Sequence, residues 1–454
     1  MAEREFDVIV IGAGPAGEVA AGRLADNGLK VAICEQELIG GECSFYACMP
    51  SKALVRAGEL VGEAGRVPGV RLASDEVDAT AALARRDEVI HDLDDSGMVP
   101  WLSERGIELF REPARLEGER RVVAGDDTLL ARKAVIVATG TAASLPPIDG
   151  LAEAEPWTNR EGTTAKQVPE SLLIIGGGPV GCELAQAWRS LGSDVALLEV
   201  ADRLLAGEEE FASEQVTAAL TQDGIDIHTG AEIVLVARGE GRFHLTLGDE
   251  RTFEVAELMV AAGRRPRTAD LGLESVGLEP GDWLAVDERM LVRGHDWLYA
   301  IGDVNHRALL THAGKYQARI AADVILGRDS RASTDTPAPP RVTFTDPQVA
   351  AVGLTAAAAS DQGIAARTVD VETSGNAGAS FHGRNTPGTS RLVIAEEGDV
   401  VIGATFVGYQ TAEMLHAATI AIVGELALDQ LRDAIPVFPT RNEIWLQLLE
   451  KAGD

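Results

Sequence analysis

Two cysteines separated by four residues, Cys43 and Cys48, are the strongest chemical signal in the sequence. If a helix starts in this segment, the two sulfurs can form a disulfide, and the helix N-terminus favours the thiolate of Cys48. A zinc site would need two further ligands, which no nearby Cys or His supplies, so we expect no bound metal. The pair therefore predicts thiol–disulfide redox chemistry rather than two buried thiols. Cys34 and Cys182 fall inside strand and helix patterns and are expected to be packing residues.

The elements around this pair repeat one pattern twice: strand, glycine turn, helix, strand, acid. In the first copy, the apolar run Val8–Ile11 precedes the turn, and a second apolar run ends at Glu35. In the second copy, Leu172–Ile175 precedes the turn, and Glu199 ends the second run. The acid lies 23 residues after the first glycine in both copies. The turns contain Gly12, Gly14, Pro15, Ala16 and Gly17 in the first copy, and Gly176, Gly178, Pro179, Val180 and Gly181 in the second.

The residue types of this repeated pattern suit a dinucleotide. The first glycine allows a tight turn, the second lets the backbone approach a pyrophosphate, and the third packs the helix on the strand. The helix N-terminus offers free N–H groups to phosphates, and the terminal carboxylate can accept ribose hydroxyls. Both copies therefore predict dinucleotide-binding domains. One FAD and one exchanging nicotinamide is the simplest assignment, with two sites for the same soluble nucleotide as the alternative.

Three further segments bear on the same two sites. The apolar strand 134–138 runs into Thr139-Gly140, and the strand 257–262 runs into Gly263-Arg264. A later strand ends in Gly302-Asp303 and is followed by a helical pattern at about 312–326. An acid at the end of a strand can accept a sugar-alcohol hydroxyl. This last segment therefore predicts that the chain returns to the first domain and completes the flavin site.

The charge of the chain excludes two classes of partner. The 454 residues include 40 basic and 71 acidic residues, which gives a net charge of −31. Such a charge repels nucleic acid and anionic membrane surfaces. No run of about 18 apolar residues occurs, and the N-terminus lacks the pattern of a signal peptide. Together with only four cysteines, these features predict a cytoplasmic protein.

With these motifs in order, the whole chain resembles the class I pyridine nucleotide–disulfide oxidoreductases, the family of dihydrolipoamide dehydrogenase, glutathione reductase and mercuric reductase. The matching order is the FAD fingerprint, C-x4-C-x-P-S-K, A-T-G, the NAD fingerprint, G-R-R-P, Y-A-x-G-D, and interface-domain patterns at 344–355 and 403–414. The resemblance implies a homodimer with a shared active site and an α/β fold with two Rossmann-type domains and a C-terminal α+β interface domain. The predicted boundaries are 1–150 for the first part of the FAD domain, 151–267 for the NAD(H) domain, 268–335 for the FAD-domain return segment and 336–454 for the dimerisation domain.

The resemblance also implies a role for each matching residue. Cys48 is expected to face the flavin as a thiolate and Cys43 to exchange with a small-molecule or thiol/disulfide substrate. Lys52 is expected near flavin N5, paired with Glu183. The ribose and ribityl contacts are expected from Glu35 and Asp303 for FAD and from Glu199 for NAD. The other expected cofactor-binding residues are the ten turn residues above, Gly41, Glu42, Ala114, Ala138, Thr139, Gly140, Gly302, Thr311, His312, Gly263 and Arg264.

NAD(H) is expected as the nicotinamide cofactor rather than NADP(H). NADP enzymes of this family usually carry an arginine just after the second strand, where this chain has Val200. Arg203 is a lone candidate for a 2′-phosphate ligand, and a carboxylate at Glu199 would repel that phosphate.

One position departs from the family pattern. Members that act on dithiols usually end in His-Pro-x-x-x-Glu, where the histidine from the partner subunit moves the thiol proton and the glutamate orients it. This chain has Phe438 before Pro439, with Glu443 in its family place. A placed general base contributes roughly 10²–10⁴-fold, so ordinary disulfide reduction is expected to be slow, unless Phe438 is a packing residue and the base lies elsewhere. Conceivable replacement bases are His312, His382 and His416.

The leading interpretation is an FAD-dependent oxidoreductase that passes electrons from NADH through a Cys43–Cys48 disulfide to an acceptor needing little base catalysis. Quinones, oxidised metals and activated disulfides are candidate acceptors. The alternative is a dihydrolipoamide dehydrogenase that moves the proton by another route. An alternative of another class is a redox-sensing flavoprotein with little turnover, against which the intact Cys43, Cys48, Lys52 and Glu183 argue.

Overall fold

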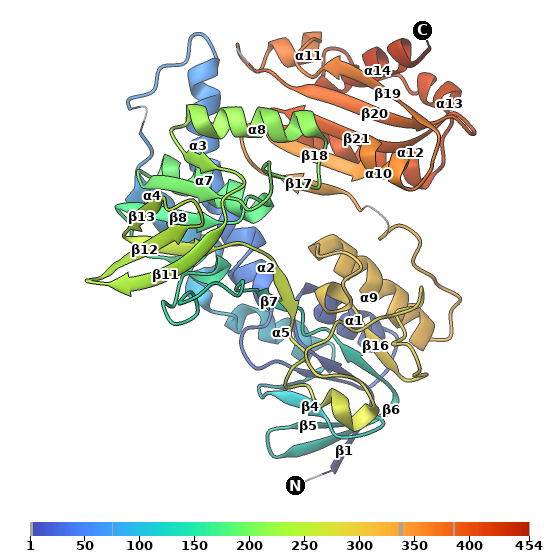
Figure 1. Ribbon diagram of the computed structural model, residues 1–454. Helices are drawn as coiled ribbons and strands as arrows, with labels where there is room; N and C mark the ends of the chain where they lie inside the picture. The colour runs from blue at the N-terminus through green and yellow to red at the C-terminus, as the bar shows by residue number, and fades with distance from the viewer. Residues whose placement is uncertain (1–2, 75, 336–338, 385, 454) are drawn as a thin grey trace. The chain divides into compact units, whose positions relative to one another are not determined.

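The computed structural model describes residues 3–74, 76–335, 339–384 and 386–453. The chain forms two compact units, each made of three stretches of sequence. The first unit contains Met1–Pro50, Asp87–Ser144 and Arg264–Thr336, and the second contains Ser51–Arg86, Leu145–Gly263 and Pro337–Asp454. Both units combine helices and strands, which confirms the predicted α/β class (Figure 1). The predicted domain boundaries stay predictions, because this division keeps the nicotinamide-binding and interface segments in one unit.

The first unit is built on a seven-stranded sheet. Its strands are β1 (Glu3–Ile11), β2 (Val31–Cys34), β3 (Glu108–Phe110), β4 (Ala114–Leu116), β5 (Arg121–Ala124), β6 (Asp127–Val137) and β16 (Leu298–Ala300). The order is β3-β2-β1-β6-β5-β4, and β16 pairs with β6. The pairs that join β1, β2, β3, β6 and β16 are parallel, whereas β4 and β5 pair antiparallel. Val8–Ile11 is buried, as expected for a central parallel strand covered on both faces.

Two helices of the first unit pack side by side and bring distant parts of the chain together (Figure 1). The helices of this unit are α1 (Pro15–Asp26), α2 (Gly41–Phe45), α5 (Val99–Glu104) and α9 (Thr311–Ile325). α1 contacts α9 near their N-termini, where a Cβ added to Gly314 would lie 3.4 Å from the Ala16 Cβ and 3.2 Å from the Gly302 Cα. The segment that contains β16 and α9 is therefore an integral part of the first unit.

A two-stranded antiparallel ribbon marks the place where the chain leaves and re-enters the first unit. It is formed by β7 (Thr141–Ala143) and β15 (Arg264–Pro266), which pair through Arg264 and Ala143. The first unit ends its middle stretch at Ser144 and resumes at Arg264. Both connections to the stretch Leu145–Gly263 of the second unit therefore start at this ribbon.

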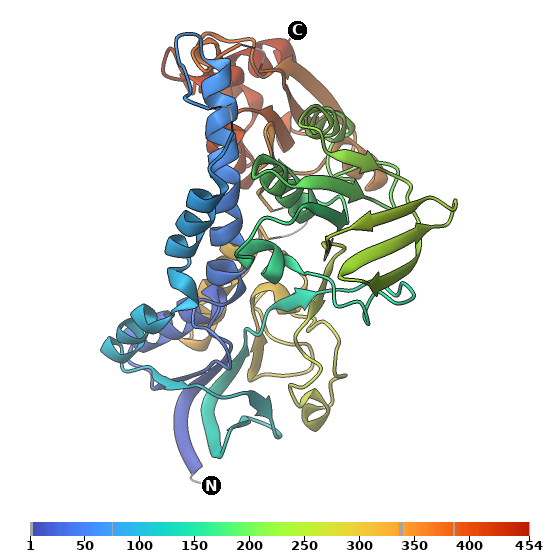
Figure 2. The same cartoon turned by 90° about the vertical axis from the view of Figure 1, so that its left-hand side faces the viewer.

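The second unit contains a four-stranded parallel sheet around the second glycine turn. Its strands are β8 (Ser171–Ile175), β9 (Asp194–Leu198), β10 (Asp226–His228) and β14 (Glu257–Val260), and the accompanying helices are α6 (Asn159–Thr164), α7 (Pro179–Ser190) and α8 (Glu210–Gln222). The order is β10-β9-β8-β14, with every pair parallel. A separate antiparallel sheet, formed by β11 (Ile233–Gly239), β12 (Arg242–Leu247) and β13 (Thr252–Val255), precedes β14 in the chain (Figure 2).

Two helices, α3 (Cys48–Arg66) and α4 (Ala79–Val89), carry the chain into the second unit and back. Leu54 of α3 and Leu83 of α4 join the same apolar core as Trp188 of α7. The indole Nε1 of Trp188 donates to the Gly162 carbonyl at 3.0 Å, so this large buried ring keeps its polar atom satisfied.

The C-terminal part of the second unit is a five-stranded antiparallel sheet with short helices. Its strands are β17 (Arg341–Thr343), β18 (Gln348–Gly353), β19 (Ala366–Glu372), β20 (Thr389–Ala395) and β21 (Val400–Gly408), in the order β17-β18-β21-β20-β19. The helices are α10 (Ala356–Asp361), α11 (Ala377–Ser380), α12 (Leu415–Val423), α13 (Leu428–Arg432) and α14 (Ile444–Gly453). Phe406 and Trp445 lie in the core between this sheet and α14. Across the described residues, we find no helix with the length and apolar character needed to span a membrane.

Candidate active site

The two cysteines of the predicted redox pair lie next to each other in the first unit. Cys43 lies in α2, and Cys48 is the first residue of α3, so the segment forms two helices rather than one. Both residues are thiols in this structure. The hydrogen bond to Cys48 and burial raise the pKa of the Cys43 thiol, while Thr311 and the positive charge of Lys315 act in the opposite direction. In this reduced arrangement, Cys43 is held as the protonated thiol.

The first residue of α9 contacts both sulfurs. The Thr311 hydroxyl lies 3.1 Å from Cys43 Sγ and 3.3 Å from Cys48 Sγ. The N-terminus of a helix carries a partial positive charge, which stabilises a nearby thiolate. His312, the next residue, is exposed. The sequence motifs placed Thr311 and His312 at the flavin, and the structure brings Thr311 to the thiols as well.

The first glycine turn has the shape that a pyrophosphate requires. Gly12 has φ +103°, and a Cβ there would lie 2.4 Å from the Ala138 carbonyl oxygen. A Cβ on Gly17 would lie 2.0 Å from the Gly12 carbonyl oxygen, so the third glycine allows the helix to approach the strand. A Cβ on Gly14 would meet nothing within 4 Å. The turn is therefore closed at its base and open at the position where phosphate oxygens would approach.

The acid at the end of β2 closes this turn. Glu35 Oε2 accepts the Ala13 backbone N–H at 2.8 Å, and Oε1 accepts the Glu37 N–H at 2.8 Å. Burial raises the pKa of the Glu35 carboxyl. A ribose hydroxyl would therefore meet a carboxylate whose orientation is already fixed by two backbone groups.

Asp303 lies at the centre of a polar network in the same unit. It follows β16, and its Oδ2 accepts the Thr141 hydroxyl at 2.9 Å. The Thr141 Oγ1 accepts Arg264 Nε at 2.9 Å. Burial raises the pKa of the Asp303 carboxyl, the negative charge of Glu42 adds to this, and Arg264 opposes it. Arg264, predicted as a cofactor-binding residue within G-R-R-P, therefore faces Thr141 and Asp303 in the first unit.

The remaining predicted FAD residues lie on the same segments. Gly41 approaches the first turn, since its Cβ would lie 3.0 Å from the Gly14 Cα, and Gly302 has φ +75°. Thr139 and Gly140 follow β6, Ala138 is buried, and Ala114 begins β4. Among the described residues, the Thr139 hydroxyl is buried with no hydrogen-bond partner. An orphaned buried hydroxyl beside an open glycine turn fits a bound dinucleotide.

The second glycine turn repeats the geometry of the first. Gly176 has φ +113°, a Cβ on Gly181 would lie 1.8 Å from the Gly176 carbonyl oxygen, and a Cβ on Gly178 would meet nothing within 4 Å. Glu199 Oε2 accepts the Gly177 N–H at 2.6 Å, and Oε1 accepts the Ala201 N–H at 2.8 Å. Pro179 and Val180 are exposed, and Gly263 ends this segment with φ +129°.

The predicted Lys52–Glu183 pair is present within the second unit. Lys52 Nζ donates to Glu183 Oε2 and lies 4.7 Å from the centre of the Phe344 ring. The other oxygen of Glu183 accepts the Phe344 backbone N–H at 2.9 Å. Glu183 is buried, so its charge is compensated by one ammonium and one backbone dipole.

The C-terminal segment has its own contacts within the second unit. Phe438 is 74% exposed. Glu443 Oε2 accepts the backbone N–H of Gly378 at 2.8 Å, close to the start of α11. A Cβ on Gly378 would lie 2.0 Å from the Thr440 carbonyl carbon, so only glycine fits there. Glu443 therefore stabilises the backbone at the start of α11. Position 438 is a phenylalanine, so this chain has no histidine there for Glu443 to orient.

The candidate replacement histidines differ in their surroundings. His382 packs at 5.8 Å from the Tyr409 ring centre, and burial and the charge of Arg441 lower the pKa of its imidazole. His416 is exposed on α12.

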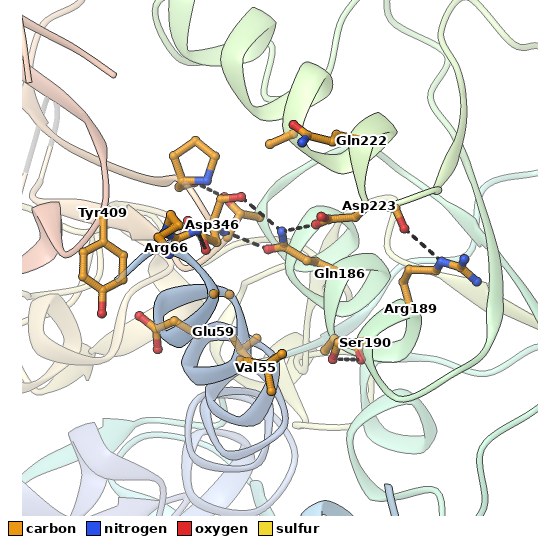
Figure 3. A pocket seen from close by; sticks show the side chains of 18 of the residues that line it. Val55, Glu59, Arg66, Gln186, Arg189, Ser190, Gln222, Asp223, Asp346 and Tyr409 are labelled. Carbon is orange, nitrogen blue, oxygen red and sulfur yellow. Dashed lines mark hydrogen bonds and ion pairs between the residues drawn. The ribbon is translucent and has the colours of Figure 1, made fainter. Parts of the chain in front are cut away.

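A cavity of about 1130 Å³ lies in the second unit, and its lining includes Phe344, the residue that contacts Lys52 and Glu183 (Figure 3). Its wall contains α3, α7 and the turn at Asp346. The Gln186 side chain accepts a hydrogen bond from the Asp346 backbone N–H at 2.8 Å and donates one to Asp223 Oδ2 at 2.7 Å. Arg66 Nη1 forms an ion pair with Asp346 Oδ2 at 2.7 Å. None of the residues predicted to be catalytic or cofactor-binding lines this cavity.

Comparison with known proteins identifies the family to which this geometry belongs. The model of the pyridine nucleotide-disulphide oxidoreductase family matches residues 6–318, and the model of the dimerisation domain of that family matches residues 339–449. The chain is a class I pyridine nucleotide–disulfide oxidoreductase. The family is FAD-dependent and uses a pyridine nucleotide, which confirms the resemblance found in the sequence.

Relatives and solved structures extend over nearly the whole chain. Dihydrolipoyl dehydrogenase of Bacillus subtilis is 31% identical over 99% of this chain and 96% of its own length. Mercuric reductase of Staphylococcus aureus is 29% identical over 97% of this chain and 81% of its own length. Among solved structures, the HOCl-induced flavoprotein disulfide reductase RclA from Escherichia coli superposes with a TM-score of 0.86 at 25% identity, covering 98% of this chain and 99% of its own. LpdA from Mycobacterium tuberculosis superposes with a TM-score of 0.85 at 26% identity, covering 98% and 99%.

Some residues of the site escaped the sequence analysis. Thr141 directly follows the A-T-G motif, and Arg267 directly follows G-R-R-P, so motif continuation was the only available signal. Lys315 and Glu18 lie one turn into α9 and α1, where their charges interact with each other. Their proximity depends on the packing of two helices almost 300 residues apart in sequence, which no local pattern contains.

Proposed function

We propose that this chain is an NADH-dependent flavoprotein that passes two electrons through Cys43 and Cys48 to an acceptor that needs little base catalysis. The observation that carries the proposal is the contact of both sulfurs with the Thr311 hydroxyl at the N-terminus of α9. A redox pair at a helix N-terminus, in the unit that holds the first glycine turn, has the electrostatics and the location that a flavin-linked disulfide needs.

Electrons and protons balance over one cycle. Bound FAD would supply the two-electron link between nicotinamide and disulfide. NADH and one proton reduce the Cys43–Cys48 disulfide to two thiols with release of NAD⁺. The two thiols then pass two electrons to the acceptor, release two protons and re-form the disulfide. Thr311 and the α9 N-terminus stabilise the thiolate of Cys48, while Cys43 is the sulfur that meets the acceptor. Glu183 accepts a hydrogen bond from Lys52 and so fixes this ammonium, which the family resemblance implies near the flavin ring.

The acceptor class is narrowed by Phe438 and by the relatives. Phenylalanine cannot take a proton, so acceptors that react directly with a thiol pair are favoured over dithiol–disulfide exchange. One relative is named mercuric reductase, and one structure of RclA from Escherichia coli is a Cu(II) complex. These names support an oxidised metal ion as acceptor, ahead of quinones and activated disulfides.

NADH is proposed as the donor because of two side chains in the second unit. The carboxylate of Glu199 is fixed at the strand end, where it would accept ribose hydroxyls and repel a 2′-phosphate. The guanidinium of Arg203 donates to the carbonyls of Ala206 at 2.7 Å and Glu208 at 3.0 Å. The lone arginine that could have bound a 2′-phosphate thus has other partners.

A homodimer is proposed from the C-terminal part of the second unit. The dimerisation-domain model matches there, and Ile435, Val437 and Phe438 expose 89%, 73% and 74% of their surface. Exposed apolar side chains in a row are typical of an interface. Light scattering on the purified protein should give twice the mass of the chain, and a fully active monomer would contradict the proposal.

The decisive experiment combines cysteine variants with a panel of acceptors. The purified protein should carry one FAD per chain and reduce Cu(II), Hg(II) or quinones with NADH. The Cys48→Ser protein should lose the long-wavelength absorbance that a thiolate beside an oxidised flavin gives, whereas Cys43→Ser should show it without reductant. An unchanged spectrum in Cys48→Ser would remove the pair from the mechanism.

Dihydrolipoamide dehydrogenase is the second candidate, because several relatives carry that name at 30–33% identity. It is tested by Phe438→His, which should raise dihydrolipoamide oxidation by up to roughly 10²–10⁴-fold while leaving flavin reduction by NADH unchanged. Phe438→Tyr serves as the control, since it keeps an aromatic ring without an imidazole. Dihydrolipoamide turnover in the wild-type protein that already matches flavin reduction would favour this candidate. An acceptor panel without any turnover would favour a redox-sensing role.

A further inference from the structure

The Arg267 side chain contacts three residues of the first unit, which lie in two segments. Its Nε donates to the Thr141 carbonyl at 3.2 Å, Nη1 to Glu37 Oε1 at 3.4 Å and Nη2 to Glu42 Oε1 at 3.0 Å. Its backbone N–H donates to the Gly140 carbonyl at 3.1 Å. One planar guanidinium therefore joins the end of the A-T-G turn to both ends of the segment 37–42.

The two carboxylates bound by Arg267 lie beside residues with proposed roles. The backbone N–H of Glu37 is held by Glu35, the acid at the end of β2. Glu42 immediately precedes Cys43 in α2. Arg267 thus connects the adenosine end of the flavin site to the cysteine end within a single side chain.

Electrostatics explains why this segment needs a cation. Three carboxylates, Glu35, Glu37 and Glu42, occur within eight residues. Burial raises the pKa of Glu35, the negative charge of Glu37 adds to this, and Arg267 opposes it. The Arg267 and Glu42 side chains are 25% and 22% exposed, so solvent screens their interaction only in part.

A second arginine shares the same carboxylate. Arg264 Nη2 lies 3.7 Å from Glu42 Oε2, and its Nε donates to Thr141. Thr141 in turn donates to Asp303, whose carboxyl is destabilised as an anion by burial and by Glu42. The positive charges of Arg264 and Arg267 therefore both compensate the negative charge of the Glu42 carboxylate.

We infer that Arg267 is a positioning residue that holds Glu42, and with it the Cys43-bearing helix α2, in the geometry that retains FAD. The inference rests on the proposed function, because it takes the first glycine turn as the FAD site and Cys43 as the acceptor-facing sulfur. Arg267 acts by neutralising Glu42 and by fixing it to the β7–β15 ribbon. Without this cation, the negative charge of Glu42 beside Asp303 would be less well compensated.

The ribbon supplies a matched control. Arg265 is the middle residue of β15, between the two arginines of the network, and its side chain is exposed. Arg265→Gln and Arg267→Gln remove the same charge from the same short segment. Only Arg267→Gln should break the hydrogen bonds to Thr141, Glu37 and Glu42.

The test measures FAD retention and the thiolate–flavin absorbance band in the holoenzyme. After dilution, the release of FAD followed by its fluorescence should be about tenfold faster in Arg267→Gln and within twofold of wild type in Arg265→Gln. Arg267→Lys keeps the positive charge but lacks the planar guanidinium, so its rate of FAD release should lie between those of the two glutamine variants. Equal release from Arg265→Gln and Arg267→Gln would overturn the inference.

A double variant separates positioning from a purely structural role. In Glu42→Gln/Arg267→Gln the uncompensated carboxylate is gone, so FAD release and the band should return to within about threefold of wild type. A double variant as impaired as Arg267→Gln would show that Arg267 does not act through Glu42. If Arg267→Gln yields no folded protein, the same comparison is made with Arg267→Lys and Glu42→Gln/Arg267→Lys. Wild-type protein that binds no FAD, or lacks the band on reduction, would refute the proposed function instead.

Discussion

The turns Gly12–Gly17 and Gly176–Gly181 have the same backbone and different surroundings. Gly14 and Gly178, the second glycines, have φ −72° and −75°, and an acid 23 residues after the first glycine accepts a turn N–H in both. Around the first turn, Gly41 packs against Gly14, and Gly302 packs against Ala16. At the second turn, Pro179 is exposed and Val180 exposes 43% of its surface.

This difference indicates how one motif serves two kinds of binding. Segments from α2 and from the stretch before α9 complete the first turn, so a ligand there would be held by parts of the chain far apart in sequence. At the second turn, Leu204 packs against Gly177, while the exposed Pro179 and Val180 suit a ligand that must leave in every cycle. Under the proposed function, the glycine fingerprint would select a dinucleotide, and the elements packed around it would set how long the dinucleotide stays bound.

The largest expected effect comes from alanine at the second glycine of each turn. A Cβ at Gly14 or Gly178 meets no protein atom within 4 Å, and both residues have φ values that alanine adopts, so each variant should fold. Gly14→Ala should weaken FAD retention by about 10- to 100-fold, because the Cβ occupies the path of the pyrophosphate. Gly178→Ala should leave the flavin in place and raise the KM for NADH by a similar factor.

Flavin content after gel filtration and steady-state kinetics measure the two effects. The two variants are controls for each other. Loss of flavin from Gly178→Ala, or full flavin retention with impaired NADH use in Gly14→Ala, would reverse the assignment of the turns.

A smaller effect is expected from the acids that close the turns. Glu199→Gln should reduce the preference for NADH over NADPH by about tenfold, because the amide no longer repels a 2′-phosphate. Glu35→Gln should leave that preference unchanged and accelerate FAD release a few-fold. The ratio of kcat/KM for the two nucleotides, measured in wild type and both variants, tests this. A shift of the ratio in Glu35→Gln would contradict the assignment.

The smallest effect on ligand binding is expected at Glu18, the residue after the first turn, because its substitution acts on the stability of the fold. Burial raises the pKa of Glu18 to about 7, with Lys315 opposing and the charge of Glu35 adding to the increase. Because the folded state binds this proton more tightly than the unfolded state, the contribution of Glu18 to stability is full below pH 4.5 and is lost as the pH rises to about 7. Glu18→Gln, which cannot ionise, should therefore be more stable than wild type at pH 8, by up to about 3 kcal/mol.

Denaturant unfolding of both proteins at pH 4.5 and pH 8 measures this difference. The two proteins should be nearly equally stable at pH 4.5, which serves as the internal control. A gain of the same size at both pH values would show that the carboxyl does not titrate as its burial implies.

The parts of the fold that the sequence predicted well are those with short-range patterns. The glycine turns, the strands before them and the acids after them lie where expected, because turn chemistry and apolar runs are local properties. The start of a helix at Cys48 was also expected and is present. The separate helix α2 around Cys43 was not, since five residues are too few for a helical period to be visible.

The parts that could not be predicted depend on long-range packing. The network Arg267–Glu42–Arg264–Thr141–Asp303 joins four segments. Glu42, Arg264 and Asp303 were predicted as cofactor-binding residues, whereas Thr141, Arg267 and the contacts among the five were not. Glu443 was predicted as a catalytic residue without a histidine to orient, and its hydrogen bond from the Gly378 N–H was not foreseen. The contacts of Phe438 with a partner chain stay a prediction, as do the assigned cofactor contacts.

The order of the first unit's strands has a consequence for how the protein is made on the ribosome. β16 pairs with β6, although about 160 residues separate their sequences, and Asp303 and Thr311 follow β16. At roughly 5–20 residues per second, translation leaves the edge of β6 unpaired for about 10 to 30 seconds. During this interval the second glycine turn and its whole parallel sheet emerge and can fold. If FAD binds to residues on both sides of that gap, as proposed, the nascent chain can capture it only after residues 145–263 have been synthesised. The exposed edge of β6 is the place where the nascent chain would need protection from aggregation.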